Sequence, residues 1–148
     1  QNDIDLADAI LQNSGTALAA NDIIEAIAVP ANTMILYAGF KVVTAMAGTT
    51  TDSEFHVGIT GTDVDLFAAS FDLDGASAGA ITPPAGLSSG VVANVPAFTA
   101  SADTIDVEIQ ASSGTITGGI IRVFAVCILL DEVSQSSSAN EVDRDLLA

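Results

Sequence analysis

Tryptophan is absent from this 148-residue chain, and cysteine, histidine and tyrosine each occur once. A single cysteine, Cys127, excludes an internal disulfide, and one cysteine with one histidine, His56, cannot build a conventional tetrahedral zinc site. A sugar-binding platform of stacked rings is also hard to assemble when aromatic residues make up 5% of the chain. We therefore expect no bound cofactor or metal.

Positive charge is equally scarce. Lys41, Arg122 and Arg144 are the only basic residues, and 19 acidic residues bring the formal net charge to -16. Phosphate binding requires clustered lysine and arginine, so nucleic acid and anionic membrane surfaces are excluded as direct partners. The sequence also has no run of 18 apolar residues that would predict a membrane-spanning helix.

Apolar residues are abundant, at 49% of the chain, whereas charged residues account for 15%. The length corresponds to one domain, and the mean hydropathy of +0.53 is high for such a domain. This composition implies more apolar surface than one small core needs. We expect contacts between copies of the chain to cover the excess.

Alternating apolar and polar residues predict strands at 23–28, 34–47 and 54–60, separated by turn residues. In the second strand, Gly39 indicates a bulge or a close approach of another backbone. His56 is expected on the outer, polar face of the third strand, as a surface residue. Residues 61–96 are interpreted as loop-rich, with an edge strand at 91–98 because Pro96 removes a hydrogen-bond donor.

The clearest strand signals come near the end of the sequence. Residues 104–110 alternate strictly, and residues 120–130 are apolar at nearly every position, which indicates that both faces are covered. We expect these two strands to form an antiparallel hairpin. The predicted core residues of this hairpin are Ile105, Val107, Ile109, Phe124 and Val126.

Several short strands with turns rich in glycine, serine and threonine favour an all-β fold, an antiparallel β-sandwich. We assign the sandwich domain to residues 21–131. Residues 1–20 are interpreted as an N-terminal arm, packed on the body or on a neighbour, in which Asp3 is a candidate helix cap. Residues 132–148 are interpreted as a serine-rich linker and an acidic C-terminal tail.

Two patterns could indicate chemistry, and both have simpler explanations. Residues 86–90 match the G-x-S-x-G motif around Ser88, but a serine nucleophile elbow needs a strand before it and a helix after it, and prolines precede this one. The carboxylates of residues 63–65 and 72–74 could bind calcium, or they could belong to acidic loops that face water. No catalytic residues are predicted, and the protein is not expected to be an enzyme.

Four segments carry a resemblance to a known class of proteins: 29–36 (VPANTMIL), 39–45 (GFKVVTA), 101–109 (SADTIDVEI) and 118–126 (GGIIRVFAV). Residues 27–131 resemble the capsid decoration, or cement, proteins of tailed bacteriophages and related small virion proteins. The resemblance implies a jelly-roll-like sandwich that is often trimeric. It also implies a location on the outer surface of the virion capsid, where the protein bridges subunits of the major capsid protein.

Both ends of the chain combine a polar turn or linker with a short apolar group, which suits attachment to a neighbouring subunit. The candidate anchoring residues are Ile4, Leu6, Ile10, Leu11, Leu146 and Leu147. Two other functions remain open: a tail or host-recognition module that uses the same sandwich, and a secreted acidic binding module.

Overall fold

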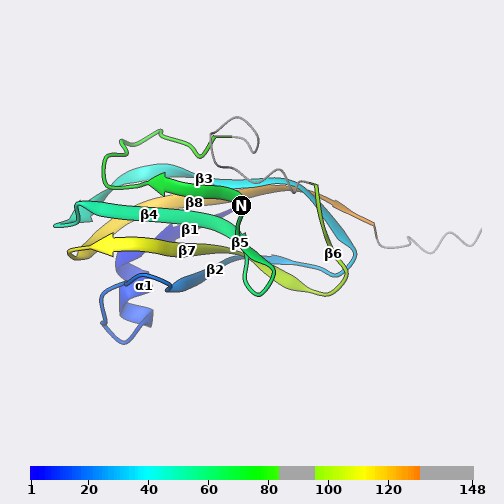
Figure 1. Ribbon diagram of the computed structural model, residues 1–148, viewed down its shortest axis with the longest axis horizontal. Helices are drawn as coiled ribbons and strands as arrows, with labels where there is room; N and C mark the ends of the chain where they lie inside the picture. Colours follow the sequence, from blue (N-terminus) through cyan, green and yellow to red (C-terminus); the bar gives the residue numbers. More distant parts are fainter. Residues whose placement is uncertain (84–95, 131–148) are drawn as a thin grey trace, which may run out of the picture.

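The computed structural model describes residues 1–83 and 96–130 and shows eight strands in two layers, with one short helix at one end (Figure 1). The elements are β1 (Asn2–Asp5), α1 (Leu6–Gln12), β2 (Ile23–Val29), β3 (Thr33–Gly48), β4 (Asp52–Ile59), β5 (Asp63–Asp72), β6 (Ala97–Thr99), β7 (Asp103–Ser113) and β8 (Ile116–Leu129). One sheet has the strand order β1-β8-β3-β6 and the other has the order β2-β7-β4-β5. All pairings are antiparallel.

This strand order is that of a jelly roll. Apart from β4 and β5, each strand lies in the opposite sheet from the strand that precedes it. Two interleaved Greek keys of this kind give eight strands in two packed sheets. The predicted all-β, antiparallel, jelly-roll-like sandwich is therefore confirmed.

The two sheets are joined at a sharp corner. The β3–β8 pair ends at Gly48 and Ile116, and the β4–β7 pair begins at Asp52 and Ser113, so one long ribbon folds over onto itself. Backbone hydrogen bonds continue through the corner, from Thr49 N to Thr115 O and from Thr51 N to Ser113 O. Gly114 has a φ of 95°, and a Cβ there would collide with the backbone of Thr49.

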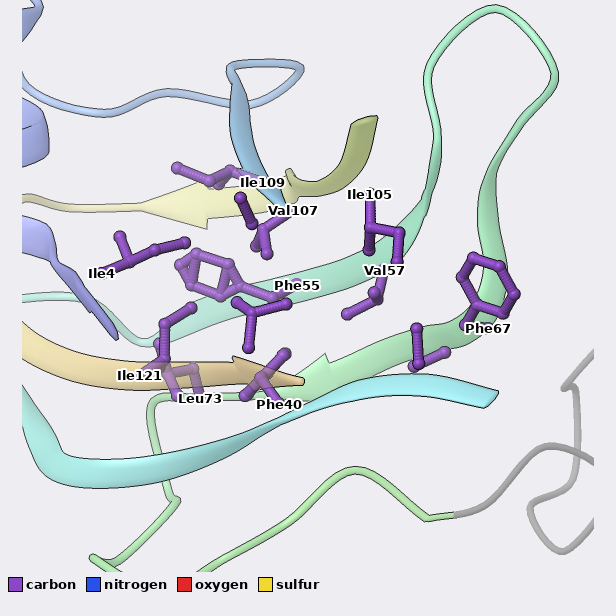
Figure 2. Packing of buried hydrophobic residues seen from close by; sticks show 14 of the residues in the cluster. Ile4, Phe40, Phe55, Val57, Phe67, Leu73, Ile105, Val107, Ile109 and Ile121 are labelled. Carbon is purple, nitrogen blue, oxygen red and sulfur yellow. The ribbon is translucent and has the colours of Figure 1, made fainter. Parts of the chain in front are cut away.

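Aliphatic side chains and phenylalanine rings fill the space between the sheets (Figure 2). Phe40 on β3 meets Phe55 on β4 and Phe71 on β5 edge to face, with ring centroids 6.4 and 4.9 Å apart. The predicted core residues of β7 are all fully buried: Ile105, Val107 and Ile109. The strict alternation of apolar and polar residues predicts these buried positions correctly, because β7 is an inner strand with one face toward the core.

The predicted hairpin between 104–110 and 120–130 is wrong. β7 pairs with β2 and β4, whereas β8 pairs with β1 and β3 in the other sheet. The predicted covering of both faces of β8 is wrong too, because Ile121 and Val123 point into the core while Phe124 is half-buried and Val126 is 52% exposed. An uninterrupted apolar run does not show which of its faces is covered.

Bulges in β3 and β5 explain two further differences between the predicted strands and the structure. In β3, the register with β8 shifts between Ile35 and Tyr37, so Met34 and Leu36 leave the core face that Ala38 and Phe40 occupy. Gly39 is not at the bulge, and the close approach there is made by the Thr82 side chain and not by another backbone as expected, because a Cβ at Gly39 would collide with Thr82 Oγ1.

The prediction that residues 61–96 are loop-rich is wrong for β5, which spans Asp63–Asp72. Its pairing with β4 shifts twice, and Ser70 adopts a positive φ of 48°. The shifts place Leu66, Phe67 and Ala68 all in buried positions, which removes the period-two signal. The predicted edge strand at 91–98 corresponds to β6 at the sheet edge, although residues 91–95 lie outside the described residues.

The N-terminal segment packs on the body, which is the first of the two expected arrangements. β1 pairs with β8, and the helix α1 follows at once with Leu6 fully buried. Asp5, and not Asp3 as expected, caps the helix by accepting a hydrogen bond from Ala7 N at 2.9 Å. The predicted linker and tail at 132–148 lie outside the described residues.

The matched pair Leu6 and Leu11 tests this placement of the N-terminal segment. Both lie on α1, but Leu6 is fully buried and Leu11 is 71% exposed. We expect Leu6→Ala to lower the free energy of unfolding by about 2–5 kcal/mol through the cavity it leaves, and Leu11→Ala to change it by less than about 0.5 kcal/mol. Urea unfolding measures both, and equal effects would show that the segment is not part of the core.

The corner glycine offers a second test. We expect Gly114→Ala to destabilise the protein far more than Gly61→Ala, because both glycines have a positive φ but only Gly114 has backbone within reach of a new Cβ. The Gly61→Ala control measures the cost of the positive φ alone, which for an alanine is about 1–2 kcal/mol. Thermal unfolding of the two variants gives the difference, and similar melting temperatures would mean that the corner tolerates a side chain.

Candidate surface for docking

The two sheets differ sharply in charge. The strands of the β2-β7-β4-β5 sheet carry no lysine or arginine but nine acidic residues: Glu25, Asp52, Glu54, Asp63, Asp65, Asp72, Asp103, Asp106 and Glu108. In the other sheet, β3, β6 and β8 carry no acidic residue at all, and β1 carries Asp3 and Asp5. Lys41 and Arg122 both lie in this second sheet, whose strands are therefore neutral overall.

The outer face of the neutral sheet ends in an uncharged, apolar surface. Met34 on β3 lies between Ile128 on β8 and Phe98 on β6, and Tyr37 pairs with Val126 in the next row. The rings of Tyr37 and Phe124 are 5.6 Å apart and extend the surface toward the centre of the sheet. We call this surface the apolar end; its well-exposed members are Leu36, Phe98, Val126 and Ile128.

The backbone of β8 is also open beside the apolar end. β1 pairs with β8 over residues 120–123, and in the described part of the chain no strand covers residues 124–129 on that side. Leu129 and Leu130 are exposed at the end of the strand. An apolar strand with an unpaired edge is a ready template for association with another chain.

The opposite half of the same face is charged. Asp3, Arg122 and Lys41 lie side by side in the register, and Arg122 donates two hydrogen bonds to the Asp3 carboxylate, at 2.6 and 2.7 Å. This bidentate contact lowers the pKa of Asp3 and raises the pKa of Arg122. Lys41 is exposed and makes no ion pair within residues 1–83 and 96–130.

His56 lies on the outer face of the acidic sheet, as expected, but it is buried and not a surface residue. Its Nδ1 is 3.4 Å from a carboxylate oxygen of Glu108, and its Nε2 is 3.5 Å from the Ser70 hydroxyl. The order serine, histidine, carboxylate matches that of a nucleophile with its base. A nucleophile of this kind also needs hydrogen-bond donors for the developing oxyanion. The carboxylate of Asp65 lies near the His56 ring and brings negative charge to the same region.

His56 Nδ1 makes no hydrogen bond in the described part of the chain, so the carboxylate does not orient the ring as it does beside a nucleophile, and the cluster is better explained as a contact that ties β4, β5 and β7 together. The two acidic pairs that could bind calcium are also separated. Asp63 lies opposite Ile59 and Asp72 opposite Glu54, so the two aspartates are separated by a five-residue stretch of β4, about 16 Å. They cannot share one ion, and the described residues contain no group of three side chains suited to a metal.

The predicted anchoring residues have different environments. Ile4 and Leu6 are buried in the core of this chain, so they are not available to a neighbour and the expectation is wrong for them. Ile10 is half-buried, and Leu11 is exposed beside a shallow groove of about 400 Å³ that it lines with Ile10 and Ile116. Leu146 and Leu147 lie outside the described residues, as does Ser88.

No protein-family model matches the chain, and no curated protein or solved structure matches it either. Within the described ranges, the structure contains no helix of the length and apolar character needed to cross a membrane.

Our sequence reasoning missed the charge difference between the sheets, although a signal for it exists. The stretch from Glu25 to Asp52 has no acidic residue between its ends, and neither does the stretch from Glu108 to Asp131. β3 lies within the first stretch and β8 within the second. Only the strand order shows that β3 and β8, which contain no acidic residue, are neighbours in one sheet.

Asp65 provides a test of the acidic sheet. The neighbouring Asp63 and partial burial raise its pKa, so the folded state disfavours the ionised form at neutral pH and this penalty disappears as the pH falls through the raised pKa. We expect Asp65→Asn to stabilise the protein at pH 7 by a few tenths of a kcal/mol, with the gain shrinking toward pH 3. Asp52→Asn, which makes the same charge change at an exposed position, is the control for melting temperatures across this range. A gain that does not depend on pH would contradict the explanation.

Proposed function

We propose that this protein is a structural component of a bacteriophage virion, which decorates the outer surface of the capsid and bridges subunits of the major capsid protein. The observation that carries the proposal is the separation of charge between the two sheets of the jelly roll. A protein that lies on a larger particle needs one face for the particle and one for water. The neutral sheet suits the first role, and the sheet with nine acidic residues suits the second.

The charge of the chain supports the same orientation. A protein with a net charge of -16 is repelled by any acidic neighbour, so it is best attached through strands that carry no net charge. Lys41 and Arg122 lie in these strands, and Lys41 is exposed and available to a carboxylate on the capsid. We propose that the half of the neutral sheet that carries Lys41 and Arg122 faces the capsid, with the sequence resemblance as the second support.

The protein is proposed to act without catalysis and in multiple copies, as a homotrimer. Bracing a capsid requires many identical contacts and a rigid body, and the buried aromatic core and hydrogen-bonded corner of the sandwich supply that rigidity. Of the proposed N-terminal anchoring residues, Leu11 is the exposed one. Deleting residues 1–12 would remove β1 and Leu6, so a deletion of this size tests folding as well as attachment.

The number of copies in purified particles tests the proposal. We expect quantitative mass spectrometry of purified virions to find hundreds of copies, in a fixed ratio to the major capsid protein. Tens of copies or fewer would favour the tail or host-recognition module, and absence from the particle would overturn a virion role altogether.

A binding experiment then tests the orientation. We expect Lys41→Gln to weaken rebinding to stripped capsids about 2–5-fold, the effect of one exposed charge pair. Gln110→Glu lowers the net charge equally but alters the exposed outer face of the acidic sheet, and it should leave rebinding unchanged. If the two variants bind alike, the neutral sheet does not face the capsid.

A further inference from the structure

We infer that a second copy of this chain covers the apolar end, so that Leu36, Phe98, Val126 and Ile128 form the contact between copies. The inference rests on the proposed function for one step, namely that the protein exists free before it joins a particle. It goes further by assigning the surface through which copies meet.

The size of the apolar end fits an interface between copies. Val126 and Ile128 are 52% and 46% exposed, and Phe98 is 57% exposed. Together with Leu36 and Leu130, these side chains expose on the order of 400 Å² of apolar surface, within the range of the largest patch on an ordinary monomer. One partner in a standard interface contributes roughly 800 Å², and the half-buried Met34, Tyr37 and Phe124 adjoin the patch.

Charge selects this surface over the others for contact between identical chains. Two copies that each carry -16 repel one another wherever their acidic sheets approach. The strands of the apolar end, β3, β6 and β8, contain no acidic residue, and Lys41 and Arg122 lie on the same face. Contact through this surface brings the fewest like charges together.

The open edge of β8 explains why the contact must be made before the protein reaches a particle. An uncovered apolar strand edge promotes open-ended association, which would remove a free protein from solution. At that stage, the partner present in quantity is another copy of the same chain. Copies arranged around one symmetry axis with their apolar ends inward form a closed assembly that cannot grow further.

Sedimentation velocity of the purified protein, without particles, tests the inference. We expect the wild-type chain to form a closed oligomer, and Ile128→Glu to raise its dissociation constant at least about 30-fold by placing a charge in the contact. Ile23→Glu is the matched control, because Ile23 is 41% exposed on a strand of the acidic sheet and the charge change is identical. This control should still assemble, and circular dichroism confirms that each variant is folded; Phe98→Ser replaces Ile128→Glu if the latter does not fold.

The single thiol gives an independent measurement. Cys127 lies at the open edge of β8, on the face opposite Val126 and Ile128 because it pairs with the buried Ile35; its thiol is exposed, and partial burial raises its pKa. We expect its rate of alkylation in the wild-type protein to fall as the protein concentration rises, because assembly covers the end of β8. A wild-type chain that stays monomeric, or an Ile128→Glu variant that assembles as tightly as Ile23→Glu, overturns the inference. A monomeric wild-type chain would also remove the proposed homotrimer, whereas particle copy number tests decoration of the capsid separately, so the two failures are distinguishable.

Discussion

The folded ribbon is the constraint on which the rest of the structure depends. β3 and β8 pair along most of their length, and at Gly48 and Gly114 the same pair of chain segments turns over to continue as β4 and β7. The turn places Phe40 of one sheet against Phe55 of the other, and both rings are part of the core. It also separates the acid-free strands β3 and β8 from the acidic strands β4 and β7, so the corner that makes the core makes the charge difference as well.

The sequence predicts those parts of the fold that depend on local alternation. The position of β7 and its inward-facing residues are predicted correctly, because its apolar and charged residues alternate without interruption. β5 and the faces of β3 were mispredicted because bulges near Ser70 and Leu36 shift the alternation by one residue. The partner of β8 was mispredicted because two strands joined by a short loop usually form a hairpin, whereas here the link between β7 and β8 carries the chain from one sheet to the other.

The candidate surface was less accessible to sequence reasoning than the fold. Composition reports 19 acidic residues without saying where they gather, and the apolar run 123–130 suggested a fully buried strand. Its exposure depends on β1 pairing over only 120–123 and on β6 covering only a short part of β3. Those are facts of strand length and position, which arise from contacts between residues far apart in the chain.

The position of β8 has a consequence for synthesis of the chain. Both β1, which starts at the second residue, and β3 must wait for β8, which ends at Leu129, before the neutral sheet can form. A ribosome adds about 5–20 residues per second, so the first strands spend several seconds without their partner while apolar segments accumulate. The neutral sheet therefore closes only after its last strand emerges, and until then its apolar strands lack the partners that cover their backbone edges.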